Sequence, residues 1–468
     1  AIPTNPPREP HSPPAATPAR PCSTRSRRDA PPDTIPISAP AGIDRSVPEG
    51  IAAVHAAWGA DGPTRVLSGA ARRARNSTVR RRKGMAPRDS SGREFGSARV
   101  AGATLHLRTF AASAPLATPE DLKAFYDEVA ESVARRGGFV VHEKAFGLLA
   151  CSQAAADARA TVFAARGLPP PVPHSYIEGR PCIGGLFSGV QVWTVDAEPG
   201  VRCTQVEAGP GSGATRVDAA GGRMLFLSGV TGRAPGAAAP GGPYRAFMAA
   251  FQQADALLRR EGFSFANVAR TWLFLDRLLQ TYEDLNRARS AFLKDVGLLT
   301  SDPEAFLPAS TGIQGRNPAG TECLLDVLAV AGVPDGKALL LPIRSPRQDS
   351  AFLYGSAFAR GMQVGTGDAP LLLVSGTASI DRQGLTTCIG DRPGQIVETY
   401  RNVAAILQDR GASLGDVALA IRYFKDEACW RAHRDLAERG LLPDLPAIDV
   451  LADVCRDDLL FEMEATAC

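Results

Sequence analysis

The sequence has no run of eighteen consecutive apolar residues, so no segment is expected to cross a membrane as a helix. It has only six histidines, with no HxxxH-type pair, and nine scattered cysteines without a CxxC pair. These absences argue against a zinc site and against a metal enzyme. They also argue against a disulfide framework, and we expect a reducing, cytoplasmic location.

What is present is typical of a soluble globular protein. The chain has 468 residues, of which 44% are hydrophobic and 22% are charged, and this length predicts two to four domains. The formal net charge is +3, but much of the positive excess lies in one arginine-rich stretch before residue 84. The remainder is near neutral or acidic, which argues against nucleic acid as the main partner.

Residues 1–97 have a composition that cannot bury a core. Twelve prolines fall within the first forty positions, and the basic run 72–83 follows. We predict a disordered tail, or sequence upstream of a start at Met85. An organellar transit peptide is the other interpretation, because the segment is basic and poor in acids.

A repeated pattern begins near residue 98. A buried strand ending in Ser-Gly occurs at 225–232 and again at 372–379, each followed by an amphipathic helix that a glycine ends, then a strand, a helix, a Leu-Pro-Ala segment and a last strand. A degenerate earlier copy has a helix at 119–137 and the segment 177–180, which resembles 313–316. We predict an α/β (α+β) fold of three similar units with pseudo-threefold arrangement, at 98–215, 216–335 and 336–468.

The last strand of the chain carries the chemistry that we expect. Glu462 lies between apolar neighbours, and a desolvated carboxyl can hold a proton near neutral pH. Arg456 precedes it and could bind a carboxylate with two hydrogen bonds. The alternative is a solvated edge strand with alternating glutamates.

The segment 446–464 resembles the closing motif of the Rid (YjgF-like) family of small αβ proteins. A longer set of motifs, in order over residues 100–468, resembles the chorismatases, which are chorismate-cleaving enzymes built from fused Rid-like units. The motifs are Arg270-Thr-Trp, Leu307 to Pro318, Ser345-Pro-Arg-Gln348, Tyr354-Gly355, Ser356 to Arg360, Val374 to Ile380 and the Cys455–Glu462 spacing.

This resemblance implies repeated Rid-like (chorismate-mutase-like) units and a role for each matching residue. Glu462 would be the catalytic acid that protonates the enolpyruvyl ether, Arg456 would bind a carboxylate, and Cys455 would select the branch that forms 3-hydroxybenzoate. The remaining substrate-binding candidates are Gly376, Gln348 and Tyr354, which lie in the matching motifs, and Arg360 and Arg316, which each follow a glycine- or aromatic-rich turn. The resemblance implies no metal, flavin or nucleotide, and chorismate as the small-molecule partner. Because three units can mimic a trimer within one chain, we expect a monomer with an internal pseudo-trimer.

Several alternatives stay open at this point. Cys455 could be a small buried hydrophobic residue, Arg360 and Arg316 could form surface ion pairs, and Arg422 could take the role of Arg360. Gly376 could serve only a tight turn, and Gln348 could cap one. The product could instead be a dihydroxycyclohexadiene carboxylate or include 4-hydroxybenzoate. A Rid-like imine hydrolase or a non-catalytic ligand-binding module is the alternative of another class.

Overall fold

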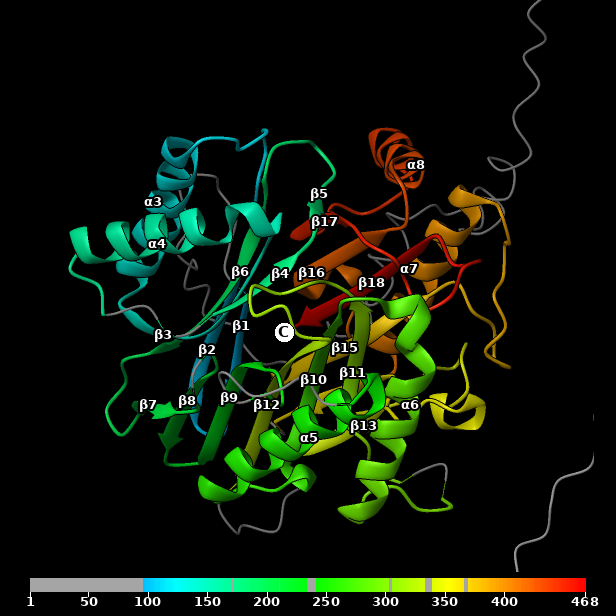
Figure 1. The fold of residues 1–468 in the computed structure, drawn as a ribbon, viewed down its shortest axis with the longest axis horizontal. Helices are drawn as coiled ribbons and strands as arrows, with labels where there is room; N and C mark the ends of the chain where they lie inside the picture. Colours follow the sequence, from blue (N-terminus) through cyan, green and yellow to red (C-terminus); the bar gives the residue numbers. More distant parts are fainter. Residues whose placement is uncertain are drawn as a thin grey trace, which may run out of the picture. The chain divides into compact units, whose positions relative to one another are not determined.

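The structure is a computed structural model that describes residues 96–169, 172, 174–209, 211–233, 241–302, 305–332, 339–365 and 369–468. All but the last two residues of the predicted tail lie outside the described residues. Figure 1 shows the described part as three β-sheets with helices on their outer sides.

Sheet 1 has the strand order β1-β2-β6-β3-β4. Its strands and helices, in chain order, are β1 (Gly96–Val100), β2 (Ala103–Ala111), α3 (Pro119–Arg136), β3 (Gly138–Gly147), α4 (Ser152–Ala165), β4 (Ser175–Glu178) and β6 (Phe187–Asp196).

Sheet 2 has the order β11-β10-β12-β9-β8-β7. Its elements are β7 (Arg202–Glu207), β8 (Gly213–Ala219), β9 (Gly222–Val230), α5 (Pro243–Arg260), β10 (Val268–Leu275), α6 (Leu278–Asp295), β11 (Ala309–Gln314) and β12 (Cys323–Gly332).

Sheet 3 has the order β13-β14-β15-β18-β16-β17-β5. Its elements are β5 (Arg180–Pro181), β13 (Leu340–Ile343), β14 (Gly361–Val364), β15 (Leu371–Ala378), α7 (Arg392–Gln408), β16 (Val417–Phe424), α8 (Glu427–Glu438), β17 (Ala447–Leu451) and β18 (Phe461–Ala467).

One topology occurs in all three sheets. In sheet 1, β2 pairs with β6, β6 pairs with β3, and β3 pairs in parallel with β4. The same order occurs as β9-β12-β10-β11 in sheet 2 and as β15-β18-β16-β17 in sheet 3. In the chain, one helix follows β2, β9 or β15, and another follows β3, β10 or β16. The predicted mixed α/β fold of three similar units is confirmed, while the boundaries of the units stay a prediction.

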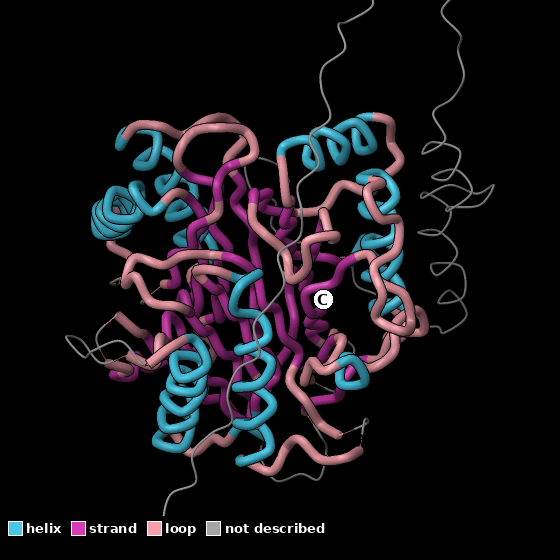
Figure 2. The backbone as a smooth tube through the Cα atoms, turned by 45° about the vertical axis from the view of Figure 1, so that its right-hand side comes forward, coloured by secondary structure: helices cyan, strands magenta, loops and turns pink. Residues whose placement is uncertain are grey.

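One hydrophobic core contains residues of all three sheets, and each of three further clusters belongs to a single sheet. The central cluster draws residues from all three sheets, for example Trp193, Trp272 and Tyr423. Each remaining cluster joins one sheet to its own two helices: α3 and α4, α5 and α6, or α7 and α8. Figure 2 shows the strands in the middle and the helices around them. The central strands of each sheet are therefore buried on both faces.

The contacts between sheets repeat around a cycle. Strands β3 and β4 of sheet 1 pack against β8 and β9 of sheet 2, strands β10 and β11 of sheet 2 pack against β14 and β15 of sheet 3, and β16 and β17 of sheet 3 pack against β2 of sheet 1. A cyclic set of like contacts is the arrangement expected of a trimer, here made by one chain.

Local sequence determines where the helices begin and end. Helix α3 starts with a capping box in which the Thr118 hydroxyl accepts from the Asp121 amide and the Asp121 carboxylate accepts from the Thr118 amide. It ends at Gly137, whose φ of 74° suits a residue without a Cβ. Within the described residues, no helix is both long and apolar enough to cross a membrane.

Candidate active site

A cavity of about 230 Å³ lies where sheets 2 and 3 meet. Helix α6 and strand β11 form one wall, and β15, β18, the segment 354–360 and the loop before β18 form the rest. The lining residues are Tyr282, Asn286, Arg289, Ser310, Gly312, Tyr354, Ser356, Phe358, Arg360, Gly376, Ala378, Ile380, Cys455, Arg456, Leu459 and Glu462.

Glu462 is placed in this cavity by the alternation of β18. Phe461 and Met463 face the helices of sheet 3, so Glu462 and Glu464 face the centre of the molecule. Glu462 is only 5% exposed. Burial and, to a lesser extent, the negative charge of Glu464 raise its pKa to about 8, against the opposing effect of Arg270. Glu462 therefore holds a proton at neutral pH, as an acid catalyst requires.

Gly376 makes room for the Glu462 carboxyl. It lies in an irregularity of β15 opposite β18, and its amide donates a hydrogen bond of 3.0 Å to the Thr311 hydroxyl. A Cβ at position 376 would overlap Oε1 of Glu462. Close approach of the acid thus explains this glycine, rather than a left-handed backbone at a tight turn.

Cys455 lies in the loop between β17 and β18 and lines the same cavity. Burial raises the pKa of its thiol to about 12, and the nearby Glu462 adds to this effect. The side chain therefore stays a neutral thiol at physiological pH, and a thiolate nucleophile is not expected.

Three arginines line the cavity without an acidic partner in the part of the chain that the structure describes. Arg360 donates to the Asp349 carbonyl at 3.1 and 2.9 Å and lies over the Tyr354 ring at 5.2 Å. Arg456 donates to the Gly384 carbonyl at 2.6 Å. Because carbonyls leave a guanidinium its full charge, both side chains can still attract an anion.

Arg289 is the arginine that sequence analysis missed. It is 4% exposed, its guanidinium lies 5.3 Å from the centre of the Phe358 ring, and it donates to the Asn286 amide oxygen at 2.5 Å. Burial lowers the pKa of Arg289. Its position on the apolar face of α6, between Leu285 and Phe292, is the signal that could have revealed it.

Comparison with known proteins adds to this geometry. No family model matches the chain. Over 231 residues the chain is 28% identical to a 3-hydroxybenzoate synthase of Streptomyces hygroscopicus, and the match spans 44% of this chain and 64% of that relative. The chain is related to the chorismatase family. The family relationship predicted from the motifs is thus confirmed, but partial coverage does not carry the relative's activity over.

Solved structures that are similar to the chain include a chorismatase and a RidA protein. A crystal structure of a chorismatase is similar at a TM-score of 0.46 and 23% identity, covering 60% of this chain and 83% of that chain. RidA from an Antarctic Psychrobacter species is similar at a TM-score of 0.23 and 18% identity, covering 27% of this chain and 98% of that chain.

Most of the predicted site residues meet in the cavity. They are Glu462, Cys455, Arg456, Gly376, Arg360 and Tyr354. Their roles stay a prediction, but the fold brings them together from the segment 354–360, β15 and the end of the chain. The alternative of a solvated edge strand for β18 is wrong, because β18 lies between β15 and β16.

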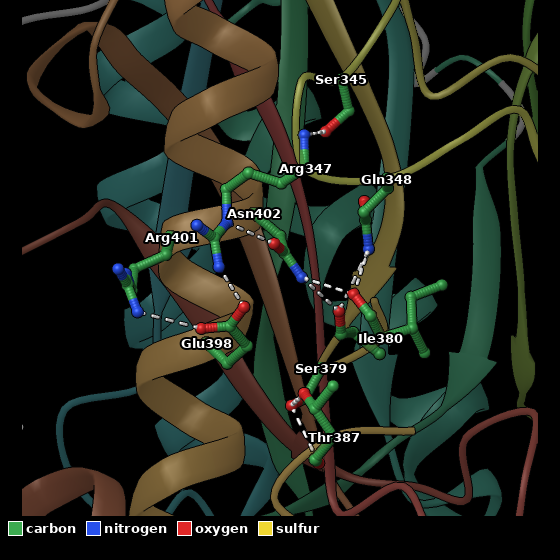
Figure 3. A network of polar contacts seen from close by, with 10 residues as sticks. Ser345, Arg347, Gln348, Ser379, Ile380, Thr387, Glu398, Arg401 and Asn402 are labelled. Atoms are coloured by element: carbon green, nitrogen blue, oxygen red, sulfur yellow. Dashed lines mark hydrogen bonds and ion pairs between the residues drawn. The ribbon is translucent and has the colours of Figure 1, made fainter. Parts of the chain in front are cut away.

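Gln348 lies elsewhere than expected. It lines a neighbouring cavity of about 350 Å³, which shares Phe358 and Arg360 with the first. Its amide nitrogen is 3.5 and 3.4 Å from the carbonyls of Ala378 and Ile380, which also accept from Asn402 (Figure 3). Gln348 therefore supports the backbone at the end of β15 and does not line the cavity of Glu462.

Two other arginines are also separated from the cavity. Arg316 forms an ion pair with Glu178, and its side chain is 55% exposed, which is the surface pairing that the sequence left open. Arg422 bonds to Asp449 at 2.6 Å and to the Tyr400 hydroxyl at 3.2 Å, on the helix side of sheet 3. Arg316 does not line the cavity, so its predicted role in substrate binding finds no support in this geometry and stays a prediction. Arg360 rather than Arg422 lines the cavity.

Proposed function

We propose that this chain is a chorismatase that cleaves chorismate to 3-hydroxybenzoate and pyruvate. The observation that supports it most directly is the cavity between sheets 2 and 3, where a glutamate that holds a proton at neutral pH lies with three arginines that lack an acidic partner among the described residues. Chorismate has two carboxylates and an acid-labile enol ether. It therefore needs cationic groups, one proton donor and little water.

The proposed reaction begins with proton transfer from Glu462 to the methylene carbon of the enolpyruvyl group. The bond between the ether oxygen and the ring then breaks, and pyruvate leaves with the bonding electrons. The neighbouring ring hydroxyl attacks the vacated ring carbon and loses its proton, which returns to Glu462. The arene-oxide-like ring isomerises to 3-hydroxybenzoate. The two products together contain every atom of chorismate, so no water is consumed.

In this proposal, the guanidinium groups of Arg289, Arg360 and Arg456 bind the substrate carboxylates and orient the ether towards Glu462. The neutral thiol of Cys455 lies against the ring and favours the aromatic product. Hydrolysis to a dihydroxycyclohexadiene carboxylate, or partial release of 4-hydroxybenzoate, would be another fate of the same ring.

The test is incubation of the purified full-length chain with chorismate, with pyruvate followed by lactate dehydrogenase and aromatic products resolved by liquid chromatography. We expect pyruvate and 3-hydroxybenzoate in equal amounts. Glu462→Gln should lower the rate by about two to four orders of magnitude, because general acid catalysis contributes that much. Glu438→Gln, at a side chain that is 66% exposed on α8, is the matched control.

Pyruvate formation no faster than the spontaneous background would contradict the proposal and favour an imine hydrolase or a binding module. Cys455→Ala is expected to keep pyruvate release and to change the ratio of ring products. An unchanged ratio would remove Cys455 from the choice of product.

A further inference from the structure

A second group of buried charges lies beside the cavity and takes no part in the reaction as proposed. It consists of Lys144 on β3, Arg270 on β10 and Glu464 on β18, one from each sheet. Lys144 Nζ is 3.2 Å from Oε1 of Glu464, and Arg270 Nη2 is 2.8 Å from Oε2. All three side chains are at most 5% exposed, so the charges are removed from water.

This group is connected to the cavity wall. Arg270 also donates to the Thr311 hydroxyl, and the same hydroxyl accepts from the amide of Gly376. Gly376 lies against the Glu462 carboxyl. The position of the proton donor is thus joined by direct contacts to the ion pairs at the centre of the three sheets.

The two cations of this group form ion pairs with only one of the two glutamates of β18. Glu462 and Glu464 share one face of β18, two residues apart. Both ion pairs of the buried cations Lys144 and Arg270 go to Glu464, and among the described residues neither cation pairs with Glu462.

The other titratable groups near Glu462 come from several elements. Tyr423 of β16 is its cross-strand neighbour, Tyr282 and Arg289 come from α6, and Tyr354, Arg360, Cys455 and Arg456 come from the loops that line the cavity. Burial raises the pKa of Tyr423, Tyr282, Tyr354 and Cys455, so these four are neutral near pH 7.

The pKa values of the two glutamates of β18 are consequently shifted in opposite directions. Burial alone would raise the pKa of Glu464, but Lys144 and Arg270 lower it below its ordinary value. Glu462 is similarly buried but forms neither ion pair, and burial together with the charge of Glu464 raises its pKa to about 8 against the weaker effect of Arg270. Pairs of acids separated in this way divide acid and charge-bearing roles between them.

We propose that Glu464 is a positioning residue: by binding both Lys144 and Arg270, it withholds these cations from Glu462 and keeps Glu462 in the protonated form. The proposal rests on the proposed function for its use in turnover, but the protonation of Glu462 can be measured without substrate. If Glu464 were neutral, Arg270 would lose its partner and would attract Glu462, which would then ionise and fail as a proton donor.

The test is an infrared titration of the full-length chain that follows the carbonyl band of protonated carboxyl groups, with Glu462→Gln to assign the band of Glu462. In Glu464→Gln, the titration midpoint of Glu462 is expected to move to lower pH by at least about one unit, which is a tenfold change in proton affinity. In Lys144→Met, Glu464 keeps Arg270 but loses one neutralising charge, so the midpoint is expected to move to higher pH.

Opposite shifts in these two variants would not arise from general loosening of the core. Turnover of chorismate should follow them: at pH 7.5 the Glu464→Gln variant should lose at least about threefold in rate and should recover as the pH is lowered. A midpoint in Glu464→Gln equal to that of the unmodified chain would overturn the proposal. Should Glu464→Gln fail to fold, an unmoved or lowered midpoint in Lys144→Met would overturn it.

Absence of pyruvate from the unmodified chain would count against the proposed function and not against the role of Glu464, because the infrared band requires no substrate.

Discussion

The contact between sheets 1 and 2 and the contact between sheets 2 and 3 use the same strands of the repeat but treat buried charge differently. Asp326 on β12 and Glu464 on β18 occupy the same position, each opposite a two-residue irregularity in the neighbouring strand. Two residues earlier, β12 has Leu324 where β18 has Glu462. The first contact therefore has no counterpart of Glu462.

Arginine shows the same contrast. In sheet 1, Arg159 of α4 bonds through Nε to both carboxylate oxygens of Glu143 at 2.8 Å. In sheet 2, Arg289 of α6 has no acidic partner among the described residues. Glu143 and Arg159 neutralise each other between sheet 1 and its own helix, whereas Arg289 lines the cavity at the contact of sheets 2 and 3 without an acidic partner among the described residues. The charge of one arginine is thus paired within the protein, and under the proposed function the charge of the other is available to a substrate.

Replacing each of these two arginines by methionine should give the largest difference between them. Arg159→Met leaves Glu143 buried without a partner, and we expect a loss of about 3–5 kcal/mol in the free energy of unfolding. Arg289→Met leaves no acid unpaired, so its stability should change little, while the KM for chorismate should rise by about tenfold or more. Chemical denaturation and steady-state kinetics measure the two effects. An Arg289→Met variant as unstable as Arg159→Met would contradict the comparison.

The pH dependence of turnover tests the contact between sheets 2 and 3. Glu462 must be protonated to act, and its pKa in the folded chain is about 8, raised mainly by burial. The rate should thus be level below pH 8 and fall tenfold per unit above it. Because the unfolded chain has an ordinary glutamate pKa, this group's contribution to stability is complete below about pH 4 and is lost as the pH rises through 8. Glu462→Gln should abolish this part of the pH dependence of unfolding.

Gly229 and Gly376 occupy matching positions of the repeat, and changing each to alanine should have a different effect. Gly229 has a φ of 70°, so Gly229→Ala should cost about 1 kcal/mol or more in stability through backbone strain. Gly376 lies outside the left-handed region, and its alanine Cβ would instead displace the Glu462 carboxyl. We expect Gly376→Ala to lower kcat by about tenfold with less effect on stability, since a small misplacement of a catalytic group is costly. Thermal unfolding and kcat separate the two, and equal kcat in Gly376→Ala would refute this explanation.

The smallest effect is expected at Arg316, whose ion pair with Glu178 bridges sheets 1 and 2 at the surface. Arg316→Ala should change stability by less than about 1 kcal/mol, because exposed pairs contribute little. It should also leave kcat/KM for chorismate unaltered. A large rise in KM would instead show that Arg316 contributes to substrate binding.

Much of the fold could be predicted because each repeat carries its own local signals. The capping box at Thr118, the apolar stripe of α5 and the buried strand β18 are all contained in short windows of sequence. The same holds for Glu462 and Cys455, which lie in one short segment of the chain. These predictions need no knowledge of how the sheets meet.

The other wall of the cavity could not be predicted in this way. Arg289 and Tyr282 belong to the helix of a different sheet, and local patterns do not state which sheets are neighbours or in what order. For the same reason the glycine turn before Arg316 predicts a site residue, although in the fold Arg316 pairs with Glu178. An arginine on an apolar helix face remains the clearest sequence signal for the part that was missed.

Both walls of the cavity belong to one polypeptide, since α6 and β18 are joined through the segment between them. In an assembly of separate subunits, such a cavity exists only while the subunits are bound, so dilution would separate its two walls. Here the effective concentration of one wall relative to the other is fixed by the chain. The specific activity should consequently not depend on enzyme concentration, and mutations in one sheet are not copied into the other two.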